Sequence, residues 1–240
     1  MPSDDLTVRP AGPDDLSAVA DLFLASRAFA VPQMPPVDDE ADARRWVLGW
    51  DLGPREVWLA EAGTGLVGFA AIEDSWLSCL YVAPDRIRDG VGSTLLEVVK
   101  AQRPGGFALW VFESNERARA FYRRHGLVEL EHTDGADNRE RSPDLRMAWP
   151  GPDPVAYFRR EIDDVDQILA VLLGRRAALT GAVQDHKGVS GHAGRDSERE
   201  KEIAQRMSAH APGLGPEAVA RIMHTVIAES LDAWEERQEG

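Results

Sequence analysis

The chain has 240 residues, of which 43% are hydrophobic and 28% charged, and its formal net charge is −14. This length and composition suit one large or two ordinary soluble domains with apolar cores. The negative charge argues against nucleic acid or an anionic membrane as a partner, because both require basic surfaces. Cys79 is the single cysteine, which excludes an intramolecular disulfide and a cysteine-based metal cluster, and we expect no metal site.

The first ten residues, MPSDDLTVRP, carry acidic side chains where a signal peptide would be basic and then apolar. No apolar run approaches the ~20 residues of a membrane-spanning helix. We therefore expect a cytoplasmic protein without membrane contact.

The N-terminal half alternates between strand and helix patterns. A strand is predicted at 6–9, followed by a helix that Asp14 or Asp15 caps and that extends to about Ala25. The apolar face of this helix is formed by Leu16, Val19, Leu22 and Phe23. The proline-rich residues 31–40 predict a loop that could cover a substrate.

Four further elements follow in the first half of the chain. A helix is predicted near 38–50. Residues 56–74 then read as two strands around a turn at 63–65, which predicts a hairpin. Residues 76–84 read as another strand, which ends at a proline.

A turn containing Gly90 and Gly92 precedes an amphipathic helix. Backbone N–H groups would therefore be exposed at a helix N-terminus, as in phosphate sites, although a purely structural turn gives the same pattern. Residues 107–130 then read as a strand, Asn115, a helix and a second strand, with Gly126 ending the helix.

Two of these segments together resemble the GCN5-related N-acetyltransferase (GNAT) family. They are LYVAP…GVGSTLL at 80–96 and N-x-x-A-x-x-FY-x-x-x-G at 115–126, and the resemblance extends over residues 6–149. It implies an α/β fold with a mixed, strongly twisted sheet that splays at its middle strands to admit acetyl-CoA as co-substrate. It also implies transfer of an acetyl or acyl group from CoA to an amine.

The same resemblance assigns roles to individual residues. It implies that Asn115 contacts the pantetheine or phosphate arm of CoA and that Tyr122 donates a proton to the departing thiolate. Backbone N–H groups of six residues would hold the pyrophosphate: Arg88, Asp89, Gly90, Val91, Gly92 and Ser93. The turn departs from the family pattern, because Ile87 and Arg88 stand where Arg or Gln and then Gly are usual. Arg86 and Arg88 could still contact phosphates.

The catalytic base of an acetyltransferase cannot be identified from this sequence. Glu73 and Asp74 are candidates before the glycine turn, whereas the centre of the strand offers only Ser78 and Cys79. A buried structural cysteine is the simpler interpretation of Cys79. The acyl acceptor cannot be identified either.

A proline-rich stretch separates the two halves of the chain. Pro150, Pro152 and Pro154 form a short, stiff linker. We therefore predict two domains, at 1–150 and 151–240.

The second half begins with a long helical pattern. Residues 155–186 contain no proline, and apolar residues recur every three or four positions from Phe158 to Val183. This predicts a helix of roughly 30 residues and ~45 Å. The short helices expected after it could not cover its apolar face, so we expect it to be built for a dimer.

Cationic residues follow the same helix. Arg176 and Lys187 would lie within about 20° of each other, whereas Arg159 lies about 100° away and could reach a partner's site in an intertwined dimer. A further set shares one face of the next helix: Asp196, Arg199 and Glu200. Solvated surface charges are the alternative interpretation.

Three stretches here resemble the all-helical, type II chorismate mutases: FRREIDDVDQILAVLLGRRAALTGAVQDHK, GRDSEREKEI and LGPEAVARIMHTVIAES. The resemblance covers most of residues 155–240. It implies an all-α, three-helix domain that forms a homodimer through its helices and binds a flat dicarboxylate between them. Rearrangement of chorismate to prephenate is pericyclic, so it requires orientation and electrostatic stabilisation but no metal or organic cofactor.

The resemblance implies that Arg159 of the opposite protomer and Arg176 clamp carboxylates, which arginine binds bidentately. It implies that Lys187 donates to the breaking ether oxygen and that Arg199 makes a further carboxylate or network contact. Three other residues match substrate contacts: Asp196 and Glu200 at the loop and hydroxyl-binding positions, and Ser230 on the last helix.

Trp234 departs from this pattern, because the family places Gln or Glu there, beside the ether oxygen. Tryptophan offers one N–H donor and no acceptor. Three interpretations remain open: Lys187 acts alone, the indole N–H substitutes, or the pocket suits a related substrate. Trp234 could also be a packing residue at the helix end.

The leading interpretation is a bifunctional enzyme that acts on small molecules, a chorismate-like dicarboxylate and an unidentified amine. One alternative is a mutase acting on 4-amino-4-deoxychorismate in an antibiotic pathway, because Glu200 could accept from an amine as well as from a hydroxyl. In the other, the mutase-like half is a non-catalytic dimerisation module or aromatic-metabolite sensor attached to an acetyltransferase.

Overall fold

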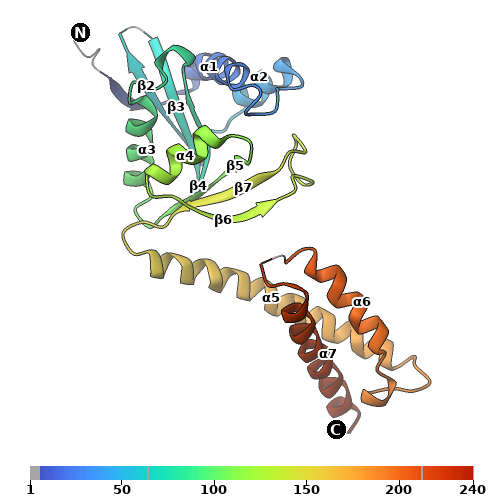
Figure 1. Ribbon diagram of the computed structural model, residues 1–240. Coiled ribbons are helices and arrows are strands. Elements are labelled where there is room, and N and C mark those ends of the chain that lie inside the picture. Colours follow the sequence, from blue (N-terminus) through green and yellow to red (C-terminus); the bar gives the residue numbers. More distant parts are fainter. Residues whose placement is uncertain (1–5, 64, 212, 240) are drawn as a thin grey trace. The chain divides into compact units, whose positions relative to one another are not determined.

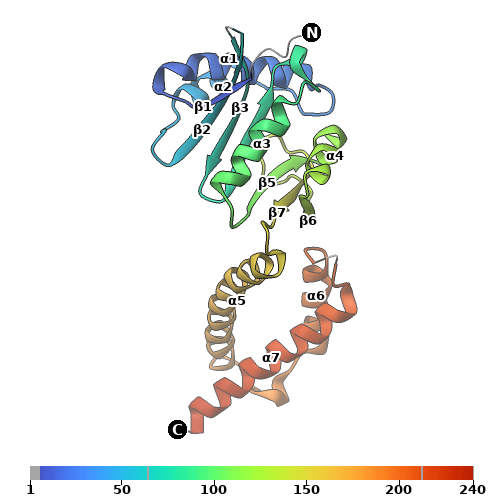
Figure 2. The same cartoon turned by 90° about the vertical axis from the view of Figure 1, so that its left-hand side faces the viewer.

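The computed structural model describes residues 6–63, 65–211 and 213–239 (Figures 1 and 2). A first compact unit ends at Phe158 and a second begins at Arg159, so each is described separately. Helix α5 (Pro154–Gln184) runs from the first unit into the second. The domain boundary between residues 150 and 151 stays a prediction. Within the described residues, no helix combines the length and apolarity required to cross a bilayer.

A seven-stranded mixed sheet forms the first unit, with strand order β1-β2-β3-β4-β5-β7-β6. The strands are β1 (Thr7–Pro10), β2 (Arg55–Ala62), β3 (Gly65–Glu73), β4 (Trp76–Val82), β5 (Phe107–Phe112), β6 (Val128–Thr133) and β7 (Asp144–Trp149). All neighbouring strands are antiparallel except β4 and β5, which are parallel. The predicted mixed sheet is thus confirmed.

The parallel strands β4 and β5 separate along their length. They pair at one register position, Trp76 with Ala108, supported by a hydrogen bond of 2.9 Å from the Ala108 N–H to the Ser75 carbonyl. Beyond this point β4 continues along β3, and β5 continues along β7. The sheet therefore opens between its middle strands, as the GNAT resemblance implies.

Helices cover both faces of the sheet (Figure 1). They are α1 (Leu16–Phe29), α2 (Glu40–Leu48), α3 (Val91–Gln102) and α4 (Glu116–Arg124). The first apolar core joins α3 and α4 to one face, and Leu95, Leu96 and Val99 of α3 are fully buried there. The second joins α1 and α2 to the other face. All four residues of the predicted apolar face of α1 are buried, which confirms that face.

Several predicted boundaries differ in detail. Helix α1 ends at Phe29, four residues beyond the predicted end. The Asp15 carboxylate accepts a hydrogen bond from the Gly12 N–H, not from the helix it precedes. Strands β2 and β3 pair through Ala62 and Gly65, as expected for the predicted hairpin, but the turn residue Thr64 lies outside the described residues.

Strand β7 is missing from the predicted elements. Its sequence alternates, and Leu145 and Met147 are fully buried on one face. The loop that precedes it, residues 134–143, carries no periodic pattern, which conceals the start of the strand.

In its described residues, 159–211 and 213–239, the second unit contains three α-helices: the C-terminal part of α5, α6 (Ser197–Ser208) and α7 (Pro216–Glu239). Helix α5 has 31 residues, close to the predicted length. Helix α7 has 24 residues, so the expectation that only short helices follow α5 is wrong. The two long helices, α5 and α7, and the shorter α6 agree with an all-helical chorismate mutase protomer.

The first turn of α5 belongs to the first unit. Tyr157 is buried against Ala108 and Ala148 of the sheet. Gly106 adopts φ +105°, and a Cβ there would collide with the Tyr157 ring. Glycine is required at this position for both reasons.

Candidate functional sites

A cavity of about 200 Å³ occupies the opening between β4 and β5. Its walls come from residues 77–81 of β4 and 109–112 of β5, and Asn115 and Tyr122 of the α4 region also line it. Because the space lies between two strands that no longer pair, backbone groups of both strands border it. This is where a linear thioester could lie.

Tyr122 lies on the buried face of α4 and lines this cavity. Burial raises the pKa of its hydroxyl. The group therefore stays neutral at ordinary pH and can act as a hydrogen-bond or proton donor.

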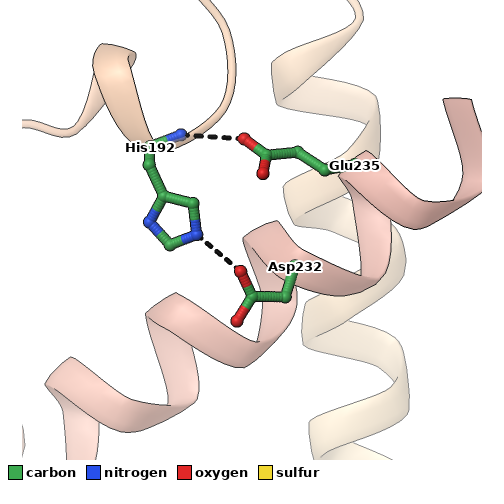
Figure 3. Close-up of side chains that lie close together, drawn as sticks. All are labelled: His192, Asp232 and Glu235. Carbon is green, nitrogen blue, oxygen red and sulfur yellow. Dashed lines mark hydrogen bonds and ion pairs between the residues drawn. The ribbon is translucent and has the colours of Figure 1, made fainter. Parts of the chain in front are cut away.

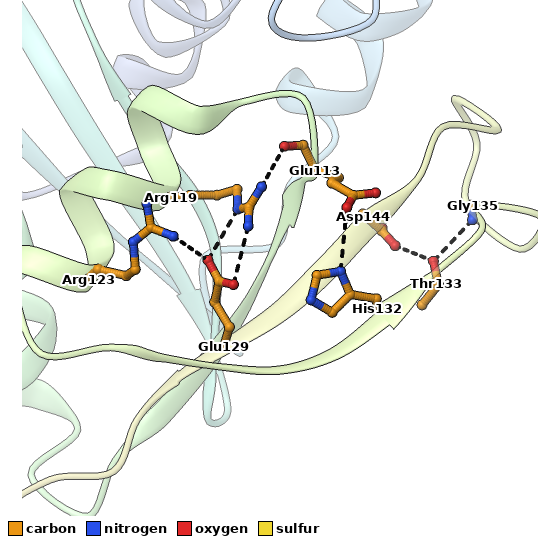
Figure 4. A network of polar contacts seen from close by, with 8 residues as sticks. All are labelled: Glu113, Arg119, Arg123, Glu129, His132, Thr133, Gly135 and Asp144. Atoms are coloured by element: carbon orange, nitrogen blue, oxygen red, sulfur yellow. Dashed lines mark hydrogen bonds and ion pairs between the residues drawn. The ribbon is translucent and has the colours of Figure 1, made fainter. Parts of the chain in front are cut away.

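Ion pairs between α4 and β6 fix the position of that helix (Figure 4). Glu129 accepts two hydrogen bonds of 3.2 Å from Arg119 and one of 3.0 Å from Arg123. The Arg119 contact lowers the pKa of the Glu129 carboxyl. Tyr122, between these two arginines in the sequence, is buried in the first apolar core.

The glycine turn enters α3 through two residues with left-handed backbone, Arg88 at φ +79° and Gly90 at φ +87°. Arg88 thus adopts the conformation for which the family pattern uses glycine. The first N–H groups of α3, including those of Val91, Gly92 and Ser93, have no acceptor within the helix. The turn can therefore present N–H groups to an anion despite the missing glycine.

Three other predicted cofactor residues make contacts within the protein. The Asn115 side chain accepts a hydrogen bond of 3.1 Å from the Ala118 N–H and so caps α4. The Ser93 hydroxyl lies 3.0 Å from Nε2 of His125. The Asp89 N–H donates to the Arg86 carbonyl at 3.2 Å.

The candidate bases Glu73 and Asp74 lie at the turn between β3 and β4, and neither is among the residues that line the cavity described above. Glu73 is paired with Arg55 at 2.6 Å. Cys79 is buried, as interpreted from the sequence, and burial raises the pKa of its thiol to about 12. It therefore remains a protonated thiol, and it lines the cavity as a structural residue.

In the helical unit, Arg176, Ser230 and Glu200 come together from α5, α7 and α6. Arg176 donates to the Ser230 hydroxyl at 3.2 Å and to the Val226 carbonyl at 3.4 Å. Burial lowers the pKa of Arg176, and the charge of Glu200 partly opposes this. Three of the predicted substrate residues thus share one interhelical region.

Arg195 also belongs to this region, although the sequence did not indicate it. It binds both oxygens of Glu200, at 2.8 and 2.7 Å, and lies 3.0 Å from Nδ1 of His224. This pairing lowers the pKa of the Glu200 carboxyl. Arg195 immediately precedes Asp196, but nothing in that spacing reveals its partner.

Other predicted residues are not part of this arrangement within the chain. Lys187 lies three residues beyond the end of α5, so its predicted place on the helical face of Arg176 is wrong, and its ammonium donates to the Gly194 carbonyl at 2.8 Å. Arg199 is exposed and pairs with Glu202 at 3.2 Å. Asp196 caps α6 through the N–H groups of Glu198 and Arg199. Arg159 is exposed on α5.

The Trp234 indole donates to Asp185 at 2.8 Å, just past the end of α5. Its ring packs near Gly181, where an added Cβ would lie 3.4 Å from Cδ1. The N–H is therefore used within the chain in this arrangement.

The loop between α5 and α6 is attached to α7 through His192 (Figure 3). Its Nε2 lies 2.6 Å from the Asp232 carboxylate, and its backbone N–H donates to Glu235 at 3.1 Å. The three side chains place potential metal ligands within 4.8 Å of one another. Both carboxylates are engaged by His192, and all three side chains are at least partly exposed, so the cluster is accounted for as a loop anchor.

Comparisons with known proteins match each half of the chain to a family. Residues 53–129 match the family model "Acetyltransferase (GNAT) domain", and residues 158–234 match "Chorismate mutase type II". The chain therefore joins a GNAT acetyltransferase domain to a domain of the type II chorismate mutase family, which confirms both resemblances.

A curated relative is "Peptidyl-lysine N-acetyltransferase YiaC" of Escherichia coli (strain K12), 28% identical over 146 residues, which are 60% of this chain and 96% of the relative. Two solved structures share the fold of the first unit. One is apo-form YjaB from Escherichia coli, with a TM-score of 0.52 and 22% identity over 61% of this chain and 98% of that one. The other is an acetyltransferase from Thermus thermophilus, with a TM-score of 0.50 and 21% identity over 60% of this chain and 96% of that one.

Proposed function

We propose that the protein is a bifunctional enzyme. Its first domain transfers an acetyl or acyl group from CoA to an amine, and its second isomerises chorismate to prephenate. The observation that carries the first assignment is the cavity between β4 and β5 with Tyr122 at its wall. The observation that carries the second is the meeting of Arg176, Glu200 and Ser230 between three helices.

For acyl transfer, the N–H groups at the start of α3 hold the pyrophosphate, and the thioester lies between β4 and β5. An amine attacks the thioester carbonyl, the C–N bond forms and the C–S bond breaks. The Tyr122 hydroxyl, kept neutral by burial, donates to the departing sulfur. Acetyl-CoA fits as the co-substrate because the domain matches the GNAT family model.

Calorimetric binding of acetyl-CoA, measured beside the rate of acetyl transfer, separates occupancy from chemistry. We expect Tyr122→Phe to leave acetyl-CoA affinity within about twofold while transfer slows by ~10². Unchanged transfer would remove the acid role of Tyr122. If the wild-type protein does not bind acetyl-CoA, the acetyltransferase assignment itself is wrong.

In the mutase domain, Arg176 holds a substrate carboxylate and Glu200 accepts from the ring hydroxyl. Lys187 approaches the ether oxygen, which requires it to leave the Gly194 carbonyl. The rearrangement requires orientation of the substrate and stabilisation of its developing charge, and these side chains can supply both.

A homodimer completes this site in our proposal. The apolar face of α5 is exposed in the single chain: Ile162, Val165, Ile168, Leu172, Leu179 and Val183 are each more than half exposed. Such a contiguous apolar face usually marks an interface. Pairing of two chains along α5 would cover it and bring Arg159 to the partner's site. A monomer in sedimentation velocity at micromolar concentration would contradict this.

The mutase assignment is tested by following chorismate loss with wild type and Arg176→Ala. We expect turnover in wild type and a loss of at least ~10² in kcat/KM for the variant, because a partly buried carboxylate clamp is removed. Turnover that survives the substitution would remove the site assignment.

The second candidate, a non-catalytic sensor or dimerisation module, is favoured by one observation: the Trp234 N–H is already bound to Asp185. If wild type is inactive and Trp234→Gln gains turnover, this candidate replaces the mutase. A third candidate is a mutase that acts on 4-amino-4-deoxychorismate, because Glu200 can accept a hydrogen bond from an amine as well as from a hydroxyl. A parallel assay with that substrate tests it.

A further inference from the structure

A second cavity, of about 340 Å³, adjoins the one between β4 and β5. Four residues line both: Arg27, Ser78, Cys79 and Tyr81. The two cavities therefore meet along β4. If the thioester lies in the first, as the proposed function requires, the second is the space from which an acceptor reaches the carbonyl carbon.

Aromatic rings form one wall of the second cavity. The Phe23 ring of α1 lies 5.8 Å from Trp46 of α2 and 5.0 Å from Tyr81 of β4, centroid to centroid. Trp46 is 45% exposed, although it is a large apolar side chain next to a core. Rings arranged in this way provide an apolar surface for a flat ligand and a favourable face for a cation.

A fixed carboxylate stands in the same cavity. Glu140, from the loop between β6 and β7, lines it and accepts a hydrogen bond of 3.1 Å from Arg27 through Oε1. Arg27 is only 6% exposed and also donates to the Pro35 carbonyl at 3.0 Å. A carboxylate can accept further hydrogen bonds through its second oxygen, so Glu140 keeps capacity for a ligand.

The loop that carries Glu140 is itself held in place. The Asn138 amide donates to the Ser142 carbonyl at 2.7 Å and to the Asp144 carboxylate at 3.0 Å. Thr133 binds the other oxygen of Asp144 and accepts from the Gly135 N–H at 3.1 Å (Figure 4). Glu140 is therefore positioned by two separate sets of contacts, one through Arg27 and one through its loop.

We propose that this second cavity is the acceptor subsite, that it takes a compact primary amine with an aromatic body, and that Glu140 binds the ammonium and then receives its proton. This rests on the proposed acetyl transfer. The volume matches a small-molecule site, and a second carboxylate, Asp38, also lines it. The guanidinium groups of Arg27 and Arg139 balance these two carboxylates. The ammonium is therefore recognised by the Glu140 oxygen that Arg27 does not bind, while the rings of Phe23, Trp46 and Tyr81 contact the body of the amine.

The reaction is balanced with the groups present. Glu140 takes one proton from the ammonium, which gives the neutral amine. The nitrogen forms a bond to the thioester carbonyl carbon, the C–S bond breaks, and the sulfur receives a proton from Tyr122. The second proton of the nitrogen returns through solvent to Tyr122, and Glu140 releases the first proton to solvent. The products are therefore the N-acetyl amine, free CoA and one proton.

Binding is tested by calorimetry with phenethylamine as the probe and saturating CoA in the cell. We expect phenethylamine to bind wild type, and Glu140→Gln to weaken the affinity at least tenfold. The matched control is Asp134→Asn, in the same loop, which keeps the hydrogen bond to the Ala136 N–H and is not among the residues that line either cavity. No binding to wild type, or equal binding to Glu140→Gln, overturns the proposal.

Kinetics then separate a base from a binding group. With phenethylamine and acetyl-CoA, we expect Glu140→Gln to lower kcat by ~10² or more and to leave KM for acetyl-CoA unchanged. Glu140→Asp should recover part of kcat. If a lysine-containing peptide is acetylated and phenethylamine is not, the acceptor is a protein lysine and the proposed class is wrong. If acetyl-CoA itself does not bind, the acetyltransferase assignment fails separately.

Discussion

The pairing of Arg195 with Glu200 gives a prediction whose size follows from the structure. Arg195→Gln removes two charge-assisted hydrogen bonds of 2.8 and 2.7 Å, and both side chains are 21% exposed. Fully exposed ion pairs contribute about 0–1 kcal/mol, whereas single hydrogen bonds to charged groups reach ~1.5–3 kcal/mol. For this partly exposed pair we expect Arg195→Gln to lower the free energy of unfolding of the helical unit by about 1–2 kcal/mol at pH 7.

The pH dependence of this stability difference tests whether the Arg195–Glu200 ion pair is its cause. Arg195 holds the pKa of Glu200 below its ordinary value of 4.5. A carboxyl whose pKa is lowered in the folded state contributes its full stability above the unfolded pKa, and the contribution is lost as the pH falls through the folded pKa. The difference between wild type and Arg195→Gln should therefore be present at pH 7 and shrink toward pH 3.

Urea unfolding followed by circular dichroism at several pH values measures this difference. Lys201→Gln is the matched control, because Lys201 pairs with Glu198 on the exposed face of the same helix. We expect its transition midpoint to equal that of wild type at both pH values. A stability loss for Arg195→Gln that is the same at pH 3 and pH 7 would refute the reasoning.

Three further predictions concern the first unit. Arg88→Gly should raise the stability of this unit by up to ~1 kcal/mol in thermal unfolding, because a non-glycine residue leaves the left-handed region. If the Arg88 side chain contacts phosphate, the same substitution should weaken acetyl-CoA binding in calorimetry. Lower stability of the variant would contradict the backbone argument. Gly106→Ala should destabilise the unit by at least ~2 kcal/mol, because the new methyl collides with Tyr157; a melting temperature equal to that of wild type would show that the ring moves freely. Cys79 should react with thiol reagents only on unfolding, because it is buried and its pKa is raised to about 12; labelling of the native protein within minutes would contradict this.

Local patterns predicted the regular elements well. The apolar repeat in residues 155–183 predicted a helix close to the observed 31 residues of α5, because that stretch contains no proline and only two glycines. The same repeat could not locate where the helix ends. Residues 185–187 contain no strong stop signal, so the sequence predicts Lys187 on the helix, whereas the helix ends at Gln184.

Contacts between distant segments could not be predicted in this way. Glu140 meets Arg27 across 113 positions, through a loop with no periodic pattern. Arg195 and Glu200 are only five positions apart, but their pairing depends on the conformation of the irregular segment before α6, which no periodic pattern describes. Family motifs supplied the expected site residues, but the residues particular to this chain were visible only in three dimensions.

Two chains share each mutase site in the proposed dimer. This is tested most directly by mixing two inactive variants, Arg159→Ala and Arg176→Ala, after joint unfolding and refolding, and by measuring chorismate turnover. In a dimer whose sites take Arg176 from one chain and Arg159 from the other, half of the mixed population is heterodimer, and each heterodimer has one intact site. We predict recovery to about a quarter of wild-type activity, as two-fold symmetry requires. No recovery, with wild type active, would contradict the shared site.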